Sequence, residues 1–418
     1  MEHWELDLDQ KDFETYLMGN DFSSAEAIYV NGGNSMKTTY ITVDPLVQNF
    51  LKGAKVEQGA ARGDLSADAA TGDTLLKVGI TSTCVGEAAS ATDTSGCFTD
   101  DGGPLTIDGV AVGSQISVNL RIRTLAKFSV GVDGKMAGYE MFDKYKAYYG
   151  VPDYADKFIT AALKGQDETS ATVSMNFVGK DNTYRIECAK KGSAYWSVWM
   201  YMIWEMEDAI ADCNDNCDPG VDNCNDAPVH AWDEAWAFYT GSLEGKYGNA
   251  AGIFPYRLAE NLCKKFKTCL GGKSAVNREL EDNFLDGKDK LDQGQCDEAK
   301  SYKKGIMTAM TIPLIQGTLH SCYKISQGDT SSKAMAEGVS FVGAILPQLH
   351  ECSAADAEIV KNHMWIDGNM NASNDGFKTC KEAIERNYAC MGMKCADIGG
   401  AVDDQTGGYL QGFEPCTD

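Results

Sequence analysis

The sequence predicts a mainly α-helical protein, with packed helical hairpins forming a bundle in two lobes, a small β insertion and disulfide bonds. Three observations support this class. Apolar residues recur at helical spacing through most of the chain after residue 139, whereas residues 60–125 are rich in Gly, Ala, Ser, Thr and Asp. Fifteen cysteines occur without any Cys-x-x-Cys pair. That pattern favours disulfides in an oxidising compartment over zinc binding.

The N-terminal region, 1–138, is expected to combine short helices with the β insertion. Residues 8–50 predict short helices broken by turns, the first beginning at Phe13 with Asp12 as its cap. The insertion occupies about 60–125. Within it, residues 74–78 and 115–120 alternate between apolar and polar side chains, the first imperfectly, which predicts strands. Asp108-Gly109 has the composition of a tight hairpin turn. Cys84 and Cys97 would close a loop within the insertion.

Helical signals dominate from residue 139 onward, and we expect two successive lobes, 139–272 and 273–418. The second lobe has a Cys-rich C-terminus, and Pro313 and Pro347 are expected to kink their helices. The expected helices cover 145–149, 154–163, 193–212, 228–240, 257–269, 279–285, 298–325, 333–352 and 377–390.

The charge and hydropathy of the chain exclude two classes of partner. A net charge of −24 disfavours nucleic acid and anionic membrane surfaces, because an acidic surface repels phosphates. The longest apolar run, 195–204, is about half of the roughly 20 residues that a membrane span needs, so we expect no span. The first residues lack the features of a signal peptide, and we expect a mature or trimmed chain. The sequon at Asn371 fits a secreted glycoprotein.

The most informative segment runs from His230 to Gly245 and opens as a helix. His230 and Glu234 are four residues apart and share one face. Trp232, Trp236 and Tyr239 share another face, with the spacing of a stripe that packs into a core. The first face is a candidate for holding a cation. The alternative is a buried aromatic helix whose polar face is simply solvated.

Carboxylates also follow one face of the preceding apolar helix. Glu205, Asp208 and Asp212 are spaced at i, i+3 and i+7, and buried carboxylates require solvent, a base or a cation. Facing helices with acidic residues and a histidine are one way to hold iron or manganese. We therefore predict a metal site formed by His230, Glu234, Glu205 and Asp208. The absence of any Glu-x-x-His motif counts against a ferritin-like centre.

The connecting loop, 212–226, is dense in oxygen ligands and predicts a possible calcium site. It lacks the glutamate that closes an EF-hand loop, so a solvated acidic loop stapled by disulfides is an equal alternative. The chain has no Gly-x-Ser-x-Gly motif and no phosphate-binding glycine loop. We therefore expect a protein that is not an enzyme.

The segment His230 to Gly245 resembles the low-iron-inducible periplasmic protein family of algae, also called the iron-assimilating proteins. Further segments are similar to the family: Ile28 to Ser35, Tyr256 to Ala259, Cys263 to Cys269, and Ile312 to Leu319. The resemblance implies a protein of the algal periplasm or cell surface that is made when iron is scarce and helps to assimilate it. It supplies no ligand set, and the four ligands named above rest on chemistry and helix spacing.

These expectations lead to one predicted function and one alternative function. We predict an extracellular or periplasmic protein, cross-linked by disulfides, that binds or concentrates iron. Its expected partners are a cell-surface receptor or further copies of the same chain. The alternative function is that of a structural or adhesive extracellular protein with calcium-stabilised loops. The odd number of cysteines favours this alternative, because one thiol is left over for linkage to another chain.

Overall fold

The computed structural model describes residues 5–41, 123–215, 227–245, 251–366, 368, 374–403 and 405–418, with short strand segments between 65 and 121. The longer helices are α1 Leu6–Met18, α2 Phe22–Asn31, α5 Glu140–Tyr149, α6 Tyr154–Lys164, α7 Asn182–Gly192, α8 Trp199–Asn214, α9 Pro228–Thr240, α10 Pro255–Phe266, α11 Ala275–Asp292, α12 Cys296–Ser326, α13 Ser332–Cys352, α14 Ala354–Met364 and α15 Asn374–Glu385. Shorter helical segments are η5 Ala126–Phe128, α4 Asp133–Met136, η6 Ser193–Val198 and α16 Cys395–Ile398.

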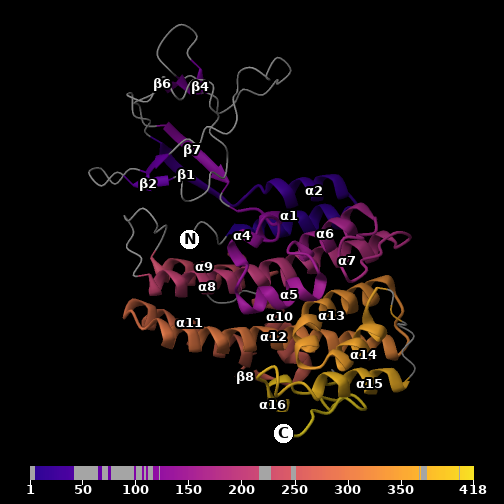
Figure 1. The fold of residues 1–418 in the computed structure, drawn as a ribbon. Coiled ribbons are helices and arrows are strands. Elements are labelled where there is room, and N and C mark those ends of the chain that lie inside the picture. Colours follow the sequence, from indigo (N-terminus) through magenta and orange to yellow (C-terminus); the bar gives the residue numbers. More distant parts are fainter. Residues whose placement is uncertain are drawn as a thin grey trace.

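The helices pack side by side into one body, which confirms the predicted mainly α class (Figure 1). Helix α8 lies along α9, α11 along α12, and α13 against α7, α12 and α14. The predicted helix at 279–285 is the middle of the longer α11. Within the described residues, no helix has the length and apolar character needed to cross a membrane. The predicted division into three regions stays a prediction.

Strands β1 to β7 form small antiparallel sheets at the end of the molecule farthest from the C-terminus (Figure 1). They are β1 Met36–Ile41, β2 Leu65–Ala67, β3 Thr74–Leu76, β4 Phe98–Thr99, β5 Thr106–Ile107, β6 Val110–Ala111 and β7 Ile116–Arg121, with β8 Cys269–Leu270 and β9 Lys273–Ser274 elsewhere. Strands β5 and β6 pair through Ile107 and Val110, which confirms the hairpin predicted at Asp108-Gly109. Strand β1 pairs with β7, so the prediction of helices throughout 8–50 was wrong for 36–41. That segment is rich in Thr, Tyr and Ile, which favour strands.

The start of the first helix also differs from its prediction. Helix α1 begins at Leu6, and Asp12 lies in its interior, so the predicted cap at Asp12 was wrong. Leu6, Phe13 and Leu17 are all buried, and their seven- and four-residue spacings define one continuous apolar stripe. Asp12 instead accepts a hydrogen bond from the side chain of Asn34 at 3.0 Å. Burial of the stripe therefore determines where the helix starts.

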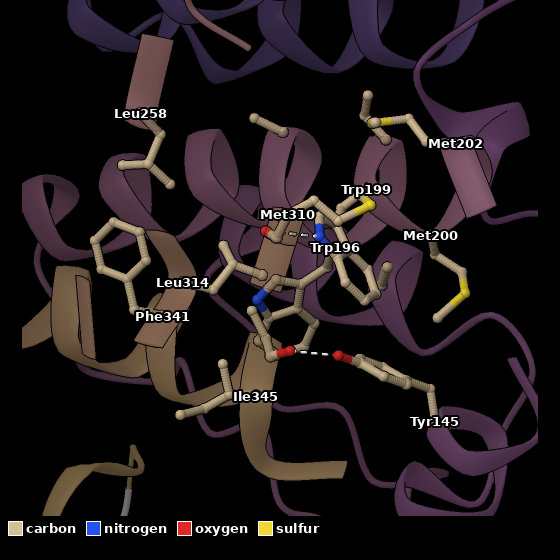
Figure 2. Close-up of a cluster of buried hydrophobic side chains, with 14 of the residues drawn as sticks. Tyr145, Trp196, Trp199, Met200, Met202, Leu258, Met310, Leu314, Phe341 and Ile345 are labelled. Atoms are coloured by element: carbon tan, nitrogen blue, oxygen red, sulfur yellow. Dashed lines mark hydrogen bonds between the residues drawn. The ribbon is translucent and has the colours of Figure 1, made fainter. Parts of the chain in front are cut away.

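Tyr145, Trp196 and Trp199 lie together in the buried core (Figure 2). Two buried tyrosines of α5 also compensate for a proline in helix α13. Pro347 has no N–H to donate to the carbonyl of Gly343, four residues earlier. Tyr149 Oη donates to that carbonyl at 2.7 Å, and Tyr145 Oη donates to the carbonyl of Ala344 at 2.5 Å. The phenol of Tyr149 thus replaces the hydrogen bond that the proline cannot donate, and both tyrosines join α5 to α13.

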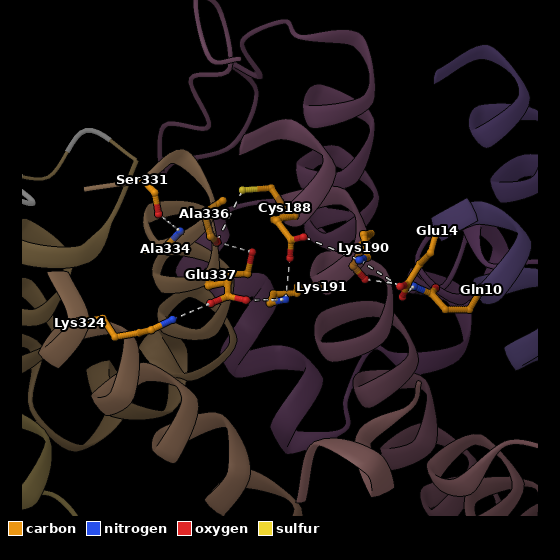
Figure 3. A network of polar contacts seen from close by, with 12 residues as sticks. Gln10, Glu14, Cys188, Lys190, Lys191, Lys324, Ser331, Ala334, Ala336 and Glu337 are labelled. Atoms are coloured by element: carbon orange, nitrogen blue, oxygen red, sulfur yellow. Dashed lines mark hydrogen bonds and ion pairs between the residues drawn. The ribbon is translucent and has the colours of Figure 1, made fainter. Parts of the chain in front are cut away.

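A chain of alternating charges joins α7 to its neighbours (Figure 3). Lys190 pairs with Glu14 of α1 at 3.2 Å, and Lys191 pairs with Glu337 of α13 at 3.4 Å. Lys324 of α12 also contacts Glu337, at 3.8 Å. These carboxylates are neutralised by lysines, and we therefore do not consider them candidates for binding a cation.

Disulfides connect distant helices, as the prediction of a stapled protein requires. Among the described cysteines four bonds are present: Cys213–Cys296, Cys263–Cys269, Cys352–Cys390 and Cys395–Cys416. Two of the sets closely spaced in sequence are fully described: Cys263 and Cys269 pair with each other, whereas Cys390 and Cys395 pair with other cysteines. Cys84, Cys97, Cys217 and Cys224 lie outside the described residues, as does the expected loop between the first two.

Candidate metal centre

The aromatic face of α9 anchors this helix to α11. Trp232 is almost fully buried and donates its indole N–H to the carbonyl of Phe284 at 2.9 Å. Tyr239 is fully buried and donates its hydroxyl to Asn277 Oδ1 at 2.5 Å. Buried aromatic side chains with satisfied polar atoms contribute strongly to packing. The predicted core-facing stripe of α9 is therefore confirmed, and the opposite face is left for other chemistry.

The end of the same segment is held by a buried carboxylate of α1. Asp7 accepts hydrogen bonds from Ser242 Oγ and from the backbone N–H of Leu243, both at 2.7 Å. Gly241 has a φ of +69°, and a Cβ there would collide with the Asp7 carboxylate. Burial raises the pKa of Asp7, although these hydrogen bonds oppose the shift. The turn thus requires both the glycine and the aspartate.

Glu244, the last carboxylate of the segment, has a structural partner as well. Arg257 of α10 contacts it through two nitrogens, with Nε at 2.7 Å from Oε1 and Nη2 close to Oε2. A two-point guanidinium–carboxylate contact fixes orientation as well as charge. Gly252 lies against Glu244 so closely that a Cβ would overlap the carboxylate. The polar groups of Ser242, Leu243 and Glu244 in this turn therefore make structural contacts with α1 and α10.

Two of the predicted ligands meet on the other face of α9. Glu205 of α8 and Glu234 of α9 each lie 3.5 Å from Nη2 of Arg123. The side chain of Glu205 is fully buried, and those of Glu234 and Arg123 are 14% and 11% exposed. Because both carboxylates contact one nitrogen, they lie within about twice that distance of each other. The packing of α8 on α9 brings them together, as the prediction of antiparallel neighbours requires.

The guanidinium that joins these carboxylates belongs to Arg123, two residues after the end of strand β7. Burial tends to lower the pKa of Arg123, but Tyr201, Glu205 and Glu234 outweigh it and raise the pKa. Its guanidinium carbon lies 5.7 Å from the centre of the Tyr201 ring. When all three groups are ionised, two carboxylates face one guanidinium, so the trio has a net negative charge.

The other two predicted ligands lie on the same helices, one turn away. Asp208 follows Glu205 on α8 and is half-buried, whereas His230 precedes Glu234 on α9 and is exposed. Asp208 and Asp212, together with their neighbours Glu207 and Asp215, face Tyr139. Burial and these carboxylates raise the pKa of the Tyr139 phenol. The α8 face is therefore strongly negative beyond the contact with Arg123.

A disulfide and an ion pair fix the position of this acidic face. Cys213 near the end of α8 is bonded to Cys296 at the start of α12. Lys303 of α12 forms an ion pair with Glu207, and both side chains are largely buried. One carboxylate of the face is thus already matched by a lysine. Glu205 and Asp208 lie on the same helix close to Glu207.

Within the described ranges, the structure contains no group of three or more His, Cys, Asp or Glu side chains arranged to hold a metal. The predicted calcium loop, 212–226, is described only as far as residue 215, and the sequon at Asn371 also lies outside the described residues. The four predicted ligands therefore stay a hypothesis, in which Glu205 and Glu234 are the pair brought together.

Sequence reasoning missed Arg123 and Tyr139. Arg123 stands three residues after a predicted strand, and nothing in its local pattern indicates a partner 82 residues away. Tyr139 precedes a helix and resembles the many aromatic residues of the core. Only the docking of the chain around α8 reveals that both residues face its carboxylates.

The chain was compared with protein families, curated proteins and solved structures. A family model described as low iron-inducible periplasmic protein matches residues 1–407. No curated protein and no solved structure matches the chain.

Proposed function

We propose that this chain, which belongs to the low iron-inducible periplasmic protein family, binds iron in the periplasm and concentrates it when iron is scarce. The family description ties such proteins to low iron and to the periplasm, in agreement with the resemblance and location predicted from the sequence. Binding itself is our proposal, as is the transfer of iron to a cell-surface receptor or to another copy of the chain.

The observation that carries the proposal is the meeting of Glu205 and Glu234 between α8 and α9. Carboxylate oxygens are hard ligands that suit iron, and imidazole also binds it well. Asp208 lies one turn along α8 and His230 one turn along α9, so small side-chain movements would bring four ligands toward one ion. Such a set would also admit manganese or zinc.

The electrostatics of the face favour a cation over an anion. Arg123 supplies one positive charge to two carboxylates, and Asp208 and Asp212 add negative charge nearby. A cation would either take the place of the guanidinium or bind beside it, on the side of Asp208. The low exposure of Glu205 would strengthen either interaction, because screening by water is weaker there.

The first test is titration of the metal-free protein with ferrous iron without oxygen, repeated with manganese(II), an ion that is oxidised far less readily than ferrous iron. A variant carrying His230→Ala and Glu234→Ala should lose stoichiometric binding. Asp233→Ala is the matched control, since Asp233 lies on the same helix but is exposed and pairs with Lys288 at 2.6 Å.

Stability measurements separate a metal site from a packing role. His230 is exposed, so His230→Ala alone should leave the melting temperature nearly unchanged while weakening iron binding. If the double variant melts far lower yet binds iron as the parent does, the segment is structural and the proposed site is wrong.

A second candidate function is a structural extracellular protein stabilised by calcium. The disulfides that join α8 to α12 and α13 to the segment after α15 favour it. If the loop 212–226 binds calcium, a calcium chelator should lower the melting temperature, because a ligand of the folded state stabilises that state. An unchanged melting temperature with chelator would reject this site.

A further inference from the structure

Two buried thiols meet between helices α12 and α15. Cys322 of α12 and Cys380 of α15 are fully buried, and neither is part of the four disulfides described above. The two helices pack against each other. Beside the thiols, the rings of Tyr323 and Phe377 are in contact, with centroids 5.1 Å apart. The two cysteines therefore lie in an ordered, well-packed part of the helical body.

The two cysteines lie on the facing sides of this helix pair, since Tyr323 follows Cys322 directly and Phe377 precedes Cys380 by one turn. An interaction with Cys380, together with burial, raises the pKa of the Cys322 thiol, in agreement with that placement. The third thiol among the described cysteines, Cys188 of α7, is placed differently. Its sulfur lies 3.8 Å from the carbonyl of Ala336 on α13. Cys188 therefore has its own surroundings, and Cys322 and Cys380 are each other's thiol partner.

We propose that Cys322 and Cys380 are joined by a disulfide in the mature periplasmic protein. Every other described cysteine except Cys188 is already bonded, and oxidising compartments maintain such bonds. The bond would tie α15 directly to the long α12. Among the described disulfides, Cys352–Cys390 joins α13 to the segment that follows α15, and none has a cysteine within α15 itself.

The bond forms by thiol–disulfide exchange with a disulfide-bearing oxidoreductase of the secretory route. The thiolate of one cysteine attacks the donor disulfide and forms a mixed disulfide, and the thiolate of the other cysteine then displaces the donor. The two cysteines together lose two protons and two electrons, and the donor becomes a dithiol. The attacking species is a thiolate, and both sulfurs are fully buried once the helices are packed. An oxidoreductase can therefore reach the two cysteines only before α15 docks onto α12.

Differential alkylation of the protein purified from its native periplasm tests the proposal. The protein is denatured without reductant and treated with iodoacetamide, then reduced and treated with N-ethylmaleimide, and mapped by mass spectrometry. Cys322 and Cys380 should carry the second label in nearly all molecules, and a non-reduced digest should contain their two peptides cross-linked. Cys188 should carry the first label, which verifies that buried thiols become accessible.

A variant supplies the matched control. Cys322→Ser should move Cys380 to the first label while Cys352 and Cys390 keep the second. In the parent protein, iodoacetamide on both Cys322 and Cys380 would overturn the proposal. A cross-link from either of them to another cysteine would overturn it as well.

Discussion

Replacement of Arg123 by methionine tests whether the buried carboxylates depend on a positive charge. Methionine keeps an apolar stem beside Tyr201 but removes the guanidinium that contacts Glu205 and Glu234 at 3.5 Å. At that distance, and with an effective dielectric constant of about 20, each contact corresponds to roughly 5 kcal/mol of Coulomb energy. Desolvation offsets most of this energy.

The net cost follows from the burial of the three groups. Removing one partner of a buried ion pair destabilises a protein by about 3–5 kcal/mol. We expect about 3 kcal/mol, because both contacts are long and Glu234 and Arg123 retain some exposure. With an unfolding entropy of about 2 cal/mol/K per residue, that loss corresponds to a drop of roughly 4 °C in melting temperature. Differential scanning calorimetry of the metal-free protein measures it.

Metal titration of the Arg123→Met variant then shows whether Glu205 and Glu234 serve only to hold the structure or also bind a cation. If Glu205 and Glu234 bind a cation, iron or manganese should substitute for the lost guanidinium. Arg123→Met should then bind metal at least about tenfold more tightly than the parent, which is about 1.4 kcal/mol. Adding Glu205→Gln to this variant lowers the negative charge, so it should recover part of the stability and abolish the gain in affinity.

Two results would refute this reasoning. A melting temperature of metal-free Arg123→Met equal to that of the parent would mean that the guanidinium does not stabilise the buried carboxylates. A loss of stability that metal leaves unchanged, with no gain in affinity, would mean that the carboxylates are not ligands.

The remaining predictions concern the buried polar groups. Asp7→Ala should destabilise the protein by about 3 kcal/mol, since it leaves the N–H of Leu243 and the hydroxyl of Ser242 without their acceptor. Denaturant unfolding measures this, with the exposed helix cap Asp21→Ala as a control of smaller effect, and equal losses would contradict it. Burial, aided by two nearby lysines, lowers the pKa of His320 from 6.5 to about 4. The unfolded state takes up a proton at this histidine below about pH 6.5, whereas the folded state does so only near pH 4. The free energy of unfolding therefore falls as the pH is lowered from 6.5 to 4, by up to about 3 kcal/mol in total. His320→Gln should flatten this part of the stability profile, and an unchanged profile would show that another group causes the acid sensitivity.

The sequence alone determined the local structure wherever one physical pattern dominated. The spacing of Trp232 and Tyr239 predicted the buried face of α9, and the turn chemistry at Asp108-Gly109 predicted the β5–β6 hairpin. Both signals are short-range, because helix and strand periods and turn conformations depend on neighbouring residues. The α1 start was missed for a related reason. A cap at Asp12 was inferred from a few residues, whereas the stripe from Leu6 to Leu17 needed a longer window.

Tertiary structure decided which distant groups meet. Asp7 binds the turn at Ser242, 235 residues away in sequence, and Arg123 meets Glu205 across 82 residues. Cys213 likewise pairs with Cys296 rather than with a cysteine close in sequence. Helical periodicity fixes the face on which a side chain lies, but not the helix that the face will contact. The sequence could therefore place Glu205 and Glu234 on the faces of two neighbouring helices. Only the docking of the segment after β7 against those helices put a guanidinium between them.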